Sequence, residues 1–93
     1  MMNDVRQKEQ QALAAEREGD FERAILIWNQ ILEAYPKWEH GFAHYNLAGC
    51  YEEVGQIDLA IETYRTAIKM SPKDSMFSDA LVSLLEAQKL GHT

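Results

Sequence analysis

Apolar residues recur at steps of three and four along most of the chain, and short polar segments containing glycine or proline separate the runs. The clearest run follows Gly55, at Ile57, Ala60, Ile61, Tyr64, Ala67 and Ile68. This spacing places the apolar side chains along one side of a helix with 3.6 residues per turn. A second run precedes the glycine, at Leu47, Ala48, Cys50, Tyr51 and Val54. Because Gly55 readily ends a helix, the pattern predicts two helices joined by a short turn.

The same helix pair is encoded a second time, earlier in the chain. Five pairs of matching residues lie 36 positions apart: Ala12 and Ala48, Gly19 and Gly55, Ala24 and Ala60, Trp28 and Tyr64, and Pro36 and Pro72. A period in this range is typical of solenoids, in which each unit buries its apolar face against its neighbours. The small residues Ala48 and Ala60 should allow two helix backbones to approach closely. We therefore predict an all-α fold of stacked helix hairpins.

The pattern predicts five helices in a single domain, residues 1–93. The first repeat covers about 5–38, the second about 41–74, and a capping helix about 75–90. Asp20 is suited to cap the second helix. The long junction at 37–41 predicts that the third helix either starts early or is irregular near Gly41. The last helix has an apolar side and a polar side, typical of a solvated cap. The apolar side carries Phe77, Ala80, Leu81, Leu84 and Leu85.

Composition and charge narrow the class of partner. The chain has 93 residues, of which 46% are hydrophobic and 26% are charged, as in ordinary globular domains. Its net charge of −6 argues against nucleic acid and against anionic membranes. The first eleven residues lack the apolar core of a secretory signal, and no run of 18 apolar residues occurs. We expect a cytoplasmic protein with a basic partner.

Candidate chemistry in the sequence is sparse. The single cysteine, Cys50, fits a small buried hydrophobe better than a catalytic thiol, because no basic group is placed to activate it. His40 and His44 have the i, i+4 spacing of zinc ligands on one helix face, but a third ligand is missing. No phosphate-binding loop or nucleophile–base motif is present. We predict no enzyme activity, no metal and no cofactor.

The second copy, with its spacing, resembles the tetratricopeptide repeat, whose pattern is W-x2-L-G-x2-Y, then A-x3-F, then P. The matching residues are His44, Leu47, Ala48, Tyr51, Ala60, Tyr64 and Pro72, with His for Trp and Ala for Gly. The first copy matches in its second half, at Ala24, Trp28 and Pro36, and poorly in its first half, where Lys8, Gln11 and Ala15 replace large residues. A degenerate third copy begins with Ser78, Leu81, Val82 and Leu85.

The resemblance implies a right-handed superhelix of antiparallel hairpins, with a concave groove lined by the first helix of each pair. A peptide or helix of another protein lies in that groove in similar proteins. By position, the groove residues are Arg6, Glu9, Leu13, Glu16, Phe42, Tyr45, Gly49, Glu52, Met76, Asp79, Ser83 and Glu86. Phe42 and Tyr45 are the candidate aromatic anchors, and Gly49 leaves room for a side chain. The acidic residues favour a basic or amphipathic partner.

Several alternatives remain open at this point. Phe42 could instead pack with Trp38 under the long junction. The chain could also be a structural module that forms a homodimer through its isolated apolar residues, or that stacks on a larger repeat protein. Those isolated residues are Leu26, Leu59, Val82 and Leu90. An RNA-binding helical repeat is disfavoured by the acidic groove.

Binding of acidic chaperone tails is not expected. Similar proteins that hold such a tail present lysine, arginine and asparagine to its carboxylate. The corresponding positions carry Glu9, Leu13, Asp79 and Ser83, and only Asn46 is matched. Asp79 would repel a carboxylate.

Overall fold

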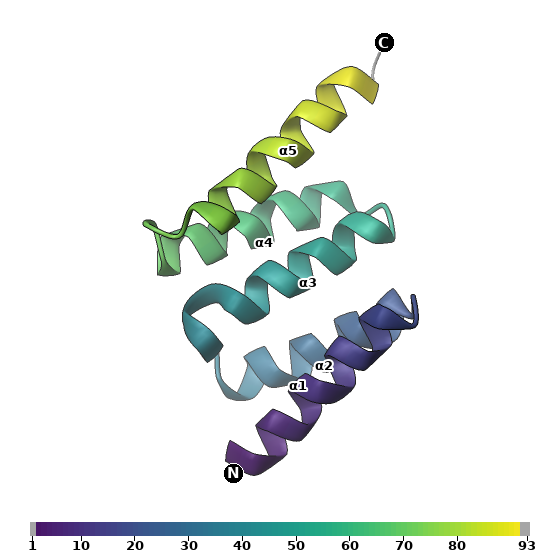
Figure 1. Ribbon diagram of the computed structural model, residues 1–93, viewed down its shortest axis with the longest axis vertical. Coiled ribbons are helices and arrows are strands. Elements are labelled where there is room, and N and C mark those ends of the chain that lie inside the picture. Colours follow the sequence, from purple (N-terminus) through teal and green to yellow (C-terminus); the bar gives the residue numbers. More distant parts are fainter. Residues whose placement is uncertain (1, 92–93) are drawn as a thin grey trace.

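The five helices predicted from the periodicity are all present in a computed structural model, which describes residues 2–91 (Figure 1). They are α1 (Met2–Arg17), α2 (Phe21–Ala34), α3 (Phe42–Glu53), α4 (Ile57–Met70) and α5 (Ser75–Gly91). A short helical turn, η1 (Trp38–Gly41), precedes α3. This part of the chain contains no strand. The all-α prediction is therefore confirmed.

The helices are stacked in chain order. Each of them packs against the next one, from α1 to α5, and α1 and α5 lie at opposite ends of the stack (Figure 1). The molecule measures 47 × 29 × 18 Å along its principal axes. The molecule is therefore elongated and flattened. None of the helices between residues 2 and 91 combines the length and the apolar character needed to cross a membrane.

The turns inside the two hairpins have matching geometry. Gly19 has φ +79° and Gly55 has φ +83°, the left-handed conformation that ends a helix at little cost only in glycine. The closing hydrogen bonds also match, from Asp20 N to Ala15 O at 2.8 Å and from Gln56 N to Tyr51 O at 2.9 Å. Asp20 caps α2 as predicted, because its Oδ1 accepts a hydrogen bond from Arg23 N at 3.2 Å. The sequence period of 36 is therefore also a period in backbone geometry.

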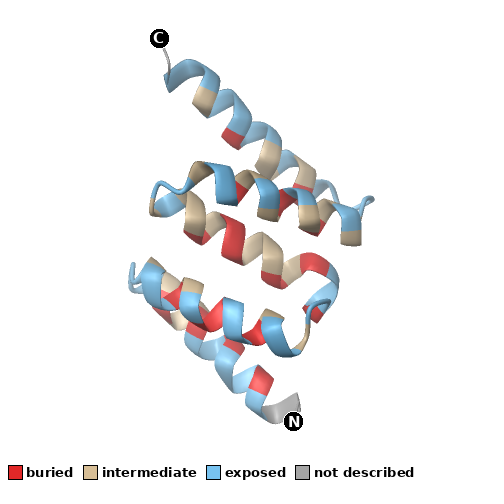
Figure 2. Ribbon diagram, turned by 180° about the vertical axis from the view of Figure 1, so that it is seen from behind, coloured by how far each residue is buried: buried red, intermediate tan, exposed pale blue. Residues whose placement is uncertain are grey.

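The core lies between successive helices. Ala12 and Ala24 are fully buried in the first hairpin, and Ala48 and Ala60 are fully buried in the second. Small side chains at these positions let the helix backbones approach closely, as the sequence predicted. Figure 2 shows buried positions in stripes along the helices, with exposed positions between them. The large ring of Trp28 is completely enclosed beside the first alanine pair.

Burial at two positions reflects how many neighbouring helices surround a helix. Ile27 is buried, because α2 packs between α1 and α3 and so buries a wide arc of its surface. Leu85 is 41% exposed although it was expected inside. The reason is that α5 packs mainly against α4, which leaves one flank of its apolar side uncovered. Burial in a stack thus depends on how many neighbours a helix has.

Candidate functional site

The junction between the two hairpins is a left-handed turn. Glu39, His40 and Gly41 have φ values of +54°, +51° and +103° in succession. Left-handed conformations cost free energy in residues other than glycine, and such costs are concentrated at functional sites and at tightly packed corners. The carbonyl oxygen of His40 accepts a hydrogen bond from Ser71 Oγ at 2.7 Å, which ties the junction to the end of α4. The predicted irregularity near Gly41 is confirmed.

The turn overturns the idea that two histidines share one helix face. His40 lies in the left-handed junction, whereas His44 lies in α3. Burial lowers the pKa of His44, and its Nδ1 atom is buried without a hydrogen-bond partner among the described residues. Within residues 2–91, no three histidine, cysteine or carboxylate side chains come together in a way that could hold a metal ion.

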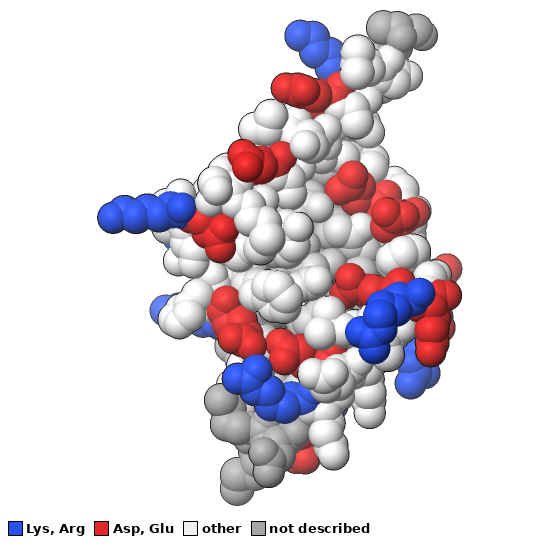
Figure 3. All heavy atoms as spheres, in the orientation of Figure 1, with Lys and Arg blue, Asp and Glu red and all other residues white. Residues whose placement is uncertain are grey.

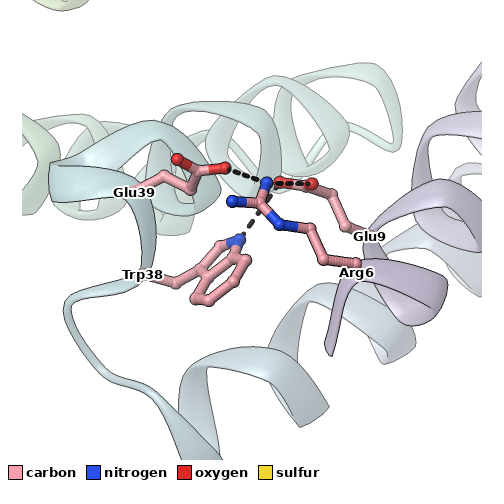
Figure 4. A network of polar contacts seen from close by, with 4 residues as sticks. All are labelled: Arg6, Glu9, Trp38 and Glu39. Atoms are coloured by element: carbon pink, nitrogen blue, oxygen red, sulfur yellow. Dashed lines mark hydrogen bonds and ion pairs between the residues drawn. The ribbon is translucent and has the colours of Figure 1, made fainter. Parts of the chain in front are cut away.

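A polar network fixes the junction against α1 (Figure 4). The indole Nε1 of Trp38 donates a hydrogen bond to Glu9 Oε2 at 3.1 Å. Arg6 Nη1 lies 2.9 Å from Glu39 Oε1 and 3.4 Å from Glu9 Oε1. The guanidinium carbon of Arg6 is also 5.1 Å from the Trp38 ring centroid, within cation–π range. Four side chains from two elements are thus held in one arrangement.

Glu9 does not occupy the position expected for a groove residue. It is only 5% exposed, and its carboxylate accepts hydrogen bonds from Trp38 and Arg6 inside the protein. A buried carboxylate needs such partners, and a buried tryptophan N–H needs an acceptor. The only sequence signal for this pair is an isolated Trp38 in a polar junction, which does not identify the acceptor.

Two other predicted groove acids make equivalent contacts within the hairpins. Trp28 Nε1 donates to Glu16 Oε2 at 2.7 Å, and Tyr64 Oη donates to Glu52 Oε1 at 3.0 Å. Both bonds join the first helix of a hairpin to its second, and the two pairs are related by the period of 36 residues. Glu16 and Glu52 therefore orient the helices of each hairpin, a role that the sequence reading did not assign to them.

The surroundings of Glu16 affect two titratable groups. Burial raises the pKa of Glu16, and hydrogen bonds from Trp28 and Cys50 offset part of that increase. Burial, together with the charges of Glu16 and Glu53 and the hydrogen bond to Glu16, raises the pKa of the Cys50 thiol to about 12. The thiol is therefore neutral at ordinary pH, and a thiolate nucleophile is strongly disfavoured.

Replacing Glu16 with glutamine should change how stability depends on pH. Because its pKa is raised in the folded state, Glu16 contributes stability that is full below its unfolded-state pKa and is lost as the pH rises through the folded-state pKa. Glu16→Gln removes this contribution and keeps an oxygen acceptor for Trp28. Urea unfolding should show that the wild-type chain loses stability relative to Glu16→Gln as the pH rises through the range in which Glu16 ionises. Glu18→Gln, an exposed position, controls for net charge, and an identical pH response of the two variants would contradict the assignment.

An aromatic cluster connects α3 to α4 and α5. Its centre is Tyr45, whose ring centroid lies 6.5 Å from Phe42, 6.1 Å from Tyr64 and 5.3 Å from Phe77. Such separations are typical of interacting rings. Phe42 and Tyr45 are only partly buried. Phe42 therefore stacks on Tyr45, whereas Trp38 packs against the ring of Tyr35, with 5.8 Å between the ring centroids.

The structure places Phe42 and Met76, both predicted for the groove, beside one cleft of about 390 Å³. The other lining residues are Glu39, His40, Ser71, Asp74 and Phe77. Gly49 lies one helical turn beyond Tyr45, and a Cβ atom there would meet only Tyr64 Oη, at 3.8 Å. The space predicted beside Gly49 is therefore present.

The remaining predicted residues are distributed along the face formed by α1, α3 and α5. Arg6, Met76, Asp79, Ser83 and Glu86 are exposed, and Leu13 packs against the core of the first hairpin. Figure 3 shows acidic side chains spread over this face around a largely uncharged centre.

A second cleft, of about 580 Å³, lies beside the junction. It is lined by Arg6, Ala34, Tyr35, Pro36, Lys37, Trp38, Glu39 and His40. The sequence reading did not identify it, because its walls come from α1, from the end of α2 and from the left-handed turn. Three members of the polar network, Arg6, Trp38 and Glu39, are among these lining residues.

Comparison with known protein families identifies the family of this chain. The model of a protein family described as a domain of unknown function (DUF6340) matches residues 10–86. These residues run from the middle of α1 to the last turns of α5 and include both hairpins. No protein with a curated description matches the chain.

Proposed function

Since the chain belongs to the DUF6340 family, a domain of unknown function, we propose that it is a tetratricopeptide-like, non-catalytic module that binds another protein. In this proposal, the hairpins stack as a right-handed superhelix. A peptide or helix of the partner lies along the face formed by α1, α3 and α5. The partner is basic or amphipathic.

The proposal of a repeat fold is supported by pairs of features that recur after 36 residues. The left-handed glycines, the closing bonds of the turns and the carboxylate bonds to Trp28 and Tyr64 all recur in this way. In a repeat protein, equivalent contacts orient equivalent helices, so the first helices of successive hairpins lie on one side. That side is the natural place for an extended binding surface.

The observation that carries the binding proposal is the cleft shared by Phe42 and Met76, next to the stacked ring of Tyr45. Partly exposed aromatic residues beside a recess are the residues that contribute most to affinity in protein interfaces. Here the recess also has an acidic border at Glu39 and Asp74. A partner with an apolar side chain flanked by lysine or arginine would complement both properties.

Catalysis has little support from the arrangement of side chains. The Cys50 thiol is buried and neutral, and Glu9, Glu16 and Glu52 accept hydrogen bonds within the fold. The cytoplasmic location expected from the sequence is part of the same proposal.

Two substitutions at Gly49 test folding and binding separately. Gly49→Ala should raise the free energy of unfolding by about 0.5–1 kcal/mol, because glycine is unfavourable inside a helix and the new Cβ meets only ordinary contacts. Gly49→Leu should keep the fold but fill the space beside Tyr45. Urea denaturation measures the first effect, and affinity capture from cell extract with mass spectrometry measures the second.

The matched control is Leu26→Ala, an exposed apolar residue on α2, away from the proposed surface. Proteins captured by the wild-type chain should be retained by Leu26→Ala and lost with Gly49→Leu. If a folded Gly49→Leu variant captures the same proteins as the wild type, the proposed surface is wrong.

A further inference from the structure

The buried positions of α5 correspond to those of α3 with a shift of 34 residues. Ala43, Leu47 and Cys50 of α3 are buried in the core cluster that includes α1 and α2. Their counterparts at this shift are Phe77, Leu81 and Leu84. Phe77 and Leu84 are buried, and Leu81 packs against the core cluster that includes α4. The last helix therefore docks on the preceding hairpin as α3 does.

The other flank of α3 has counterparts on α5 that the described residues cover only in part. Ala48 and Tyr51 pack in the cluster that joins α3 to α4. At the same shift they correspond to Val82 and Leu85, which are 52% and 41% exposed. The α5 helix thus presents the surface on which the second helix of a third hairpin would pack.

The same flank of α5 also carries a hydrogen-bond acceptor, the carboxylate of Glu86. Glu16 and Glu52 each accept a bond from an aromatic residue of the second helix in their hairpin. Glu86 is the third member of this series, 34 residues after Glu52. Between residues 4 and 91, no side chain forms a hydrogen bond or ion pair with it. Its carboxylate is therefore available to a donor from outside the described chain.

We propose that the flank of α5 formed by Val82, Leu85 and Glu86 binds an amphipathic helix of a partner protein, which completes the third hairpin in trans. The two existing hairpins define the chemistry of that helix. In each of them, the second helix carries an alanine and, four residues later, a tryptophan or tyrosine: Ala24 and Trp28, and Ala60 and Tyr64. The partner helix carries the same pair, and its aromatic donor binds Glu86.

Charge favours a different protein over a second copy of this chain. Each copy has a net charge of −6, so two copies repel one another. Asp79 and Glu86 are exposed on α5, and they complement a helix with basic residues beside its apolar stripe. This surface does not include the cleft beside Phe42, although Asp79 and Glu86 are also among the residues predicted for the groove along α1, α3 and α5. Binding to it does not depend on the proposed function of that cleft.

The test uses the full chain and a synthetic helix of defined sequence. The probe is a peptide with the sequence of residues 57–70, cross-linked between positions 58 and 62 to fix its helix. Both positions are exposed in α4, and the cross-link replaces two acids while Arg65 and Lys69 remain. Calorimetric titration should give saturable one-to-one binding below 100 µM, and amide chemical-shift changes should centre on residues 81–86.

Variants identify the contacts that carry this binding. Val82→Asp should weaken binding at least tenfold, while Leu26→Asp, at another exposed apolar position, should leave it unchanged. A peptide carrying Tyr64→Phe should bind at least threefold more weakly to the wild-type chain, because it lacks the hydroxyl donor for Glu86. Circular dichroism verifies that each variant remains helical.

Four results would overturn the proposal. They are the absence of saturable binding up to 1 mM, full binding by Val82→Asp, shift changes centred on α3 through exchange with the resident α4, or a stable homodimer that Val82→Asp dissociates. The last result would assign the surface to a second copy. All four can occur whether or not Gly49→Leu abolishes partner capture, so the two proposals can fail separately.

Discussion

Replacing Gly41 with alanine is expected to lower the free energy of unfolding by about 2–5 kcal/mol, which combines backbone strain with overpacking. Gly41 has φ +103°, a conformation that side chains other than glycine rarely adopt. A Cβ atom there would lie 3.0 Å from Ala67 O and 3.0 Å from Phe77 Cε2. Neither backbone nor ring can move without disturbing the contact between the junction, α4 and α5. Urea denaturation measures the loss.

Variants of the other two left-handed glycines separate the cost of backbone strain from the cost of overpacking. Gly19 and Gly55 have similarly positive φ values, but a Cβ atom at either position meets nothing within 4 Å. Gly19→Ala and Gly55→Ala should therefore show only the backbone cost, about 1 kcal/mol. If all three variants lose the same stability, close packing at Gly41 is not what requires glycine there.

Replacing Trp38 with alanine is expected to cost about 3–5 kcal/mol of unfolding free energy, as for other large buried aromatic residues. Trp38 is buried beneath Arg6, and its N–H donates a hydrogen bond to the buried carboxylate of Glu9. Alanine would leave a cavity and also an incompletely paired buried charge. Because domains of this size have a total stability of roughly 5–15 kcal/mol, a substantial unfolded population is expected near body temperature. Circular dichroism with thermal and urea unfolding measures the change.

A second variant divides this effect into volume and hydrogen bonding. Trp38→Phe keeps most of the apolar ring but removes the N–H donor to Glu9. This variant should lower the free energy of unfolding by about 1–3 kcal/mol, which is the penalty for a buried acceptor without its hydrogen-bond partner. The double variant Trp38→Phe with Glu9→Leu should recover part of that loss, since neither polar group then remains. No recovery in the double variant would indicate that the Trp38–Glu9 bond contributes little.

The helix hairpins could be predicted because their signals are local. The apolar spacing after Gly55 and the repeated glycine at Gly19 define helices and turns through backbone preferences of nearby residues. The fully buried alanine pairs followed from the same period. Of the residues predicted for the groove, the structure brings Phe42 and Met76 together beside one cleft, and the groove itself stays a prediction.

The roles of the acids could not be predicted in this way. Glu9 was assigned to the groove by its position, but its carboxylate is buried against Trp38, 29 residues further along the chain. A carboxylate in a helix has the same local sequence signature whether it faces water or a neighbouring helix. Only the contact between α1 and the junction distinguishes the two cases.

The sequence by itself determined the five helices, the period that relates the two hairpins and the small residues at which the helices meet. These properties depend on helical geometry and on residues within a few turns of one another. The tertiary structure decided the left-handed path through Glu39 and His40, the pairing of carboxylates with Trp28, Trp38 and Tyr64, and the exposure of Leu85. Each of these depends on which neighbour a helix has across space, and local side-chain periodicity does not contain that information.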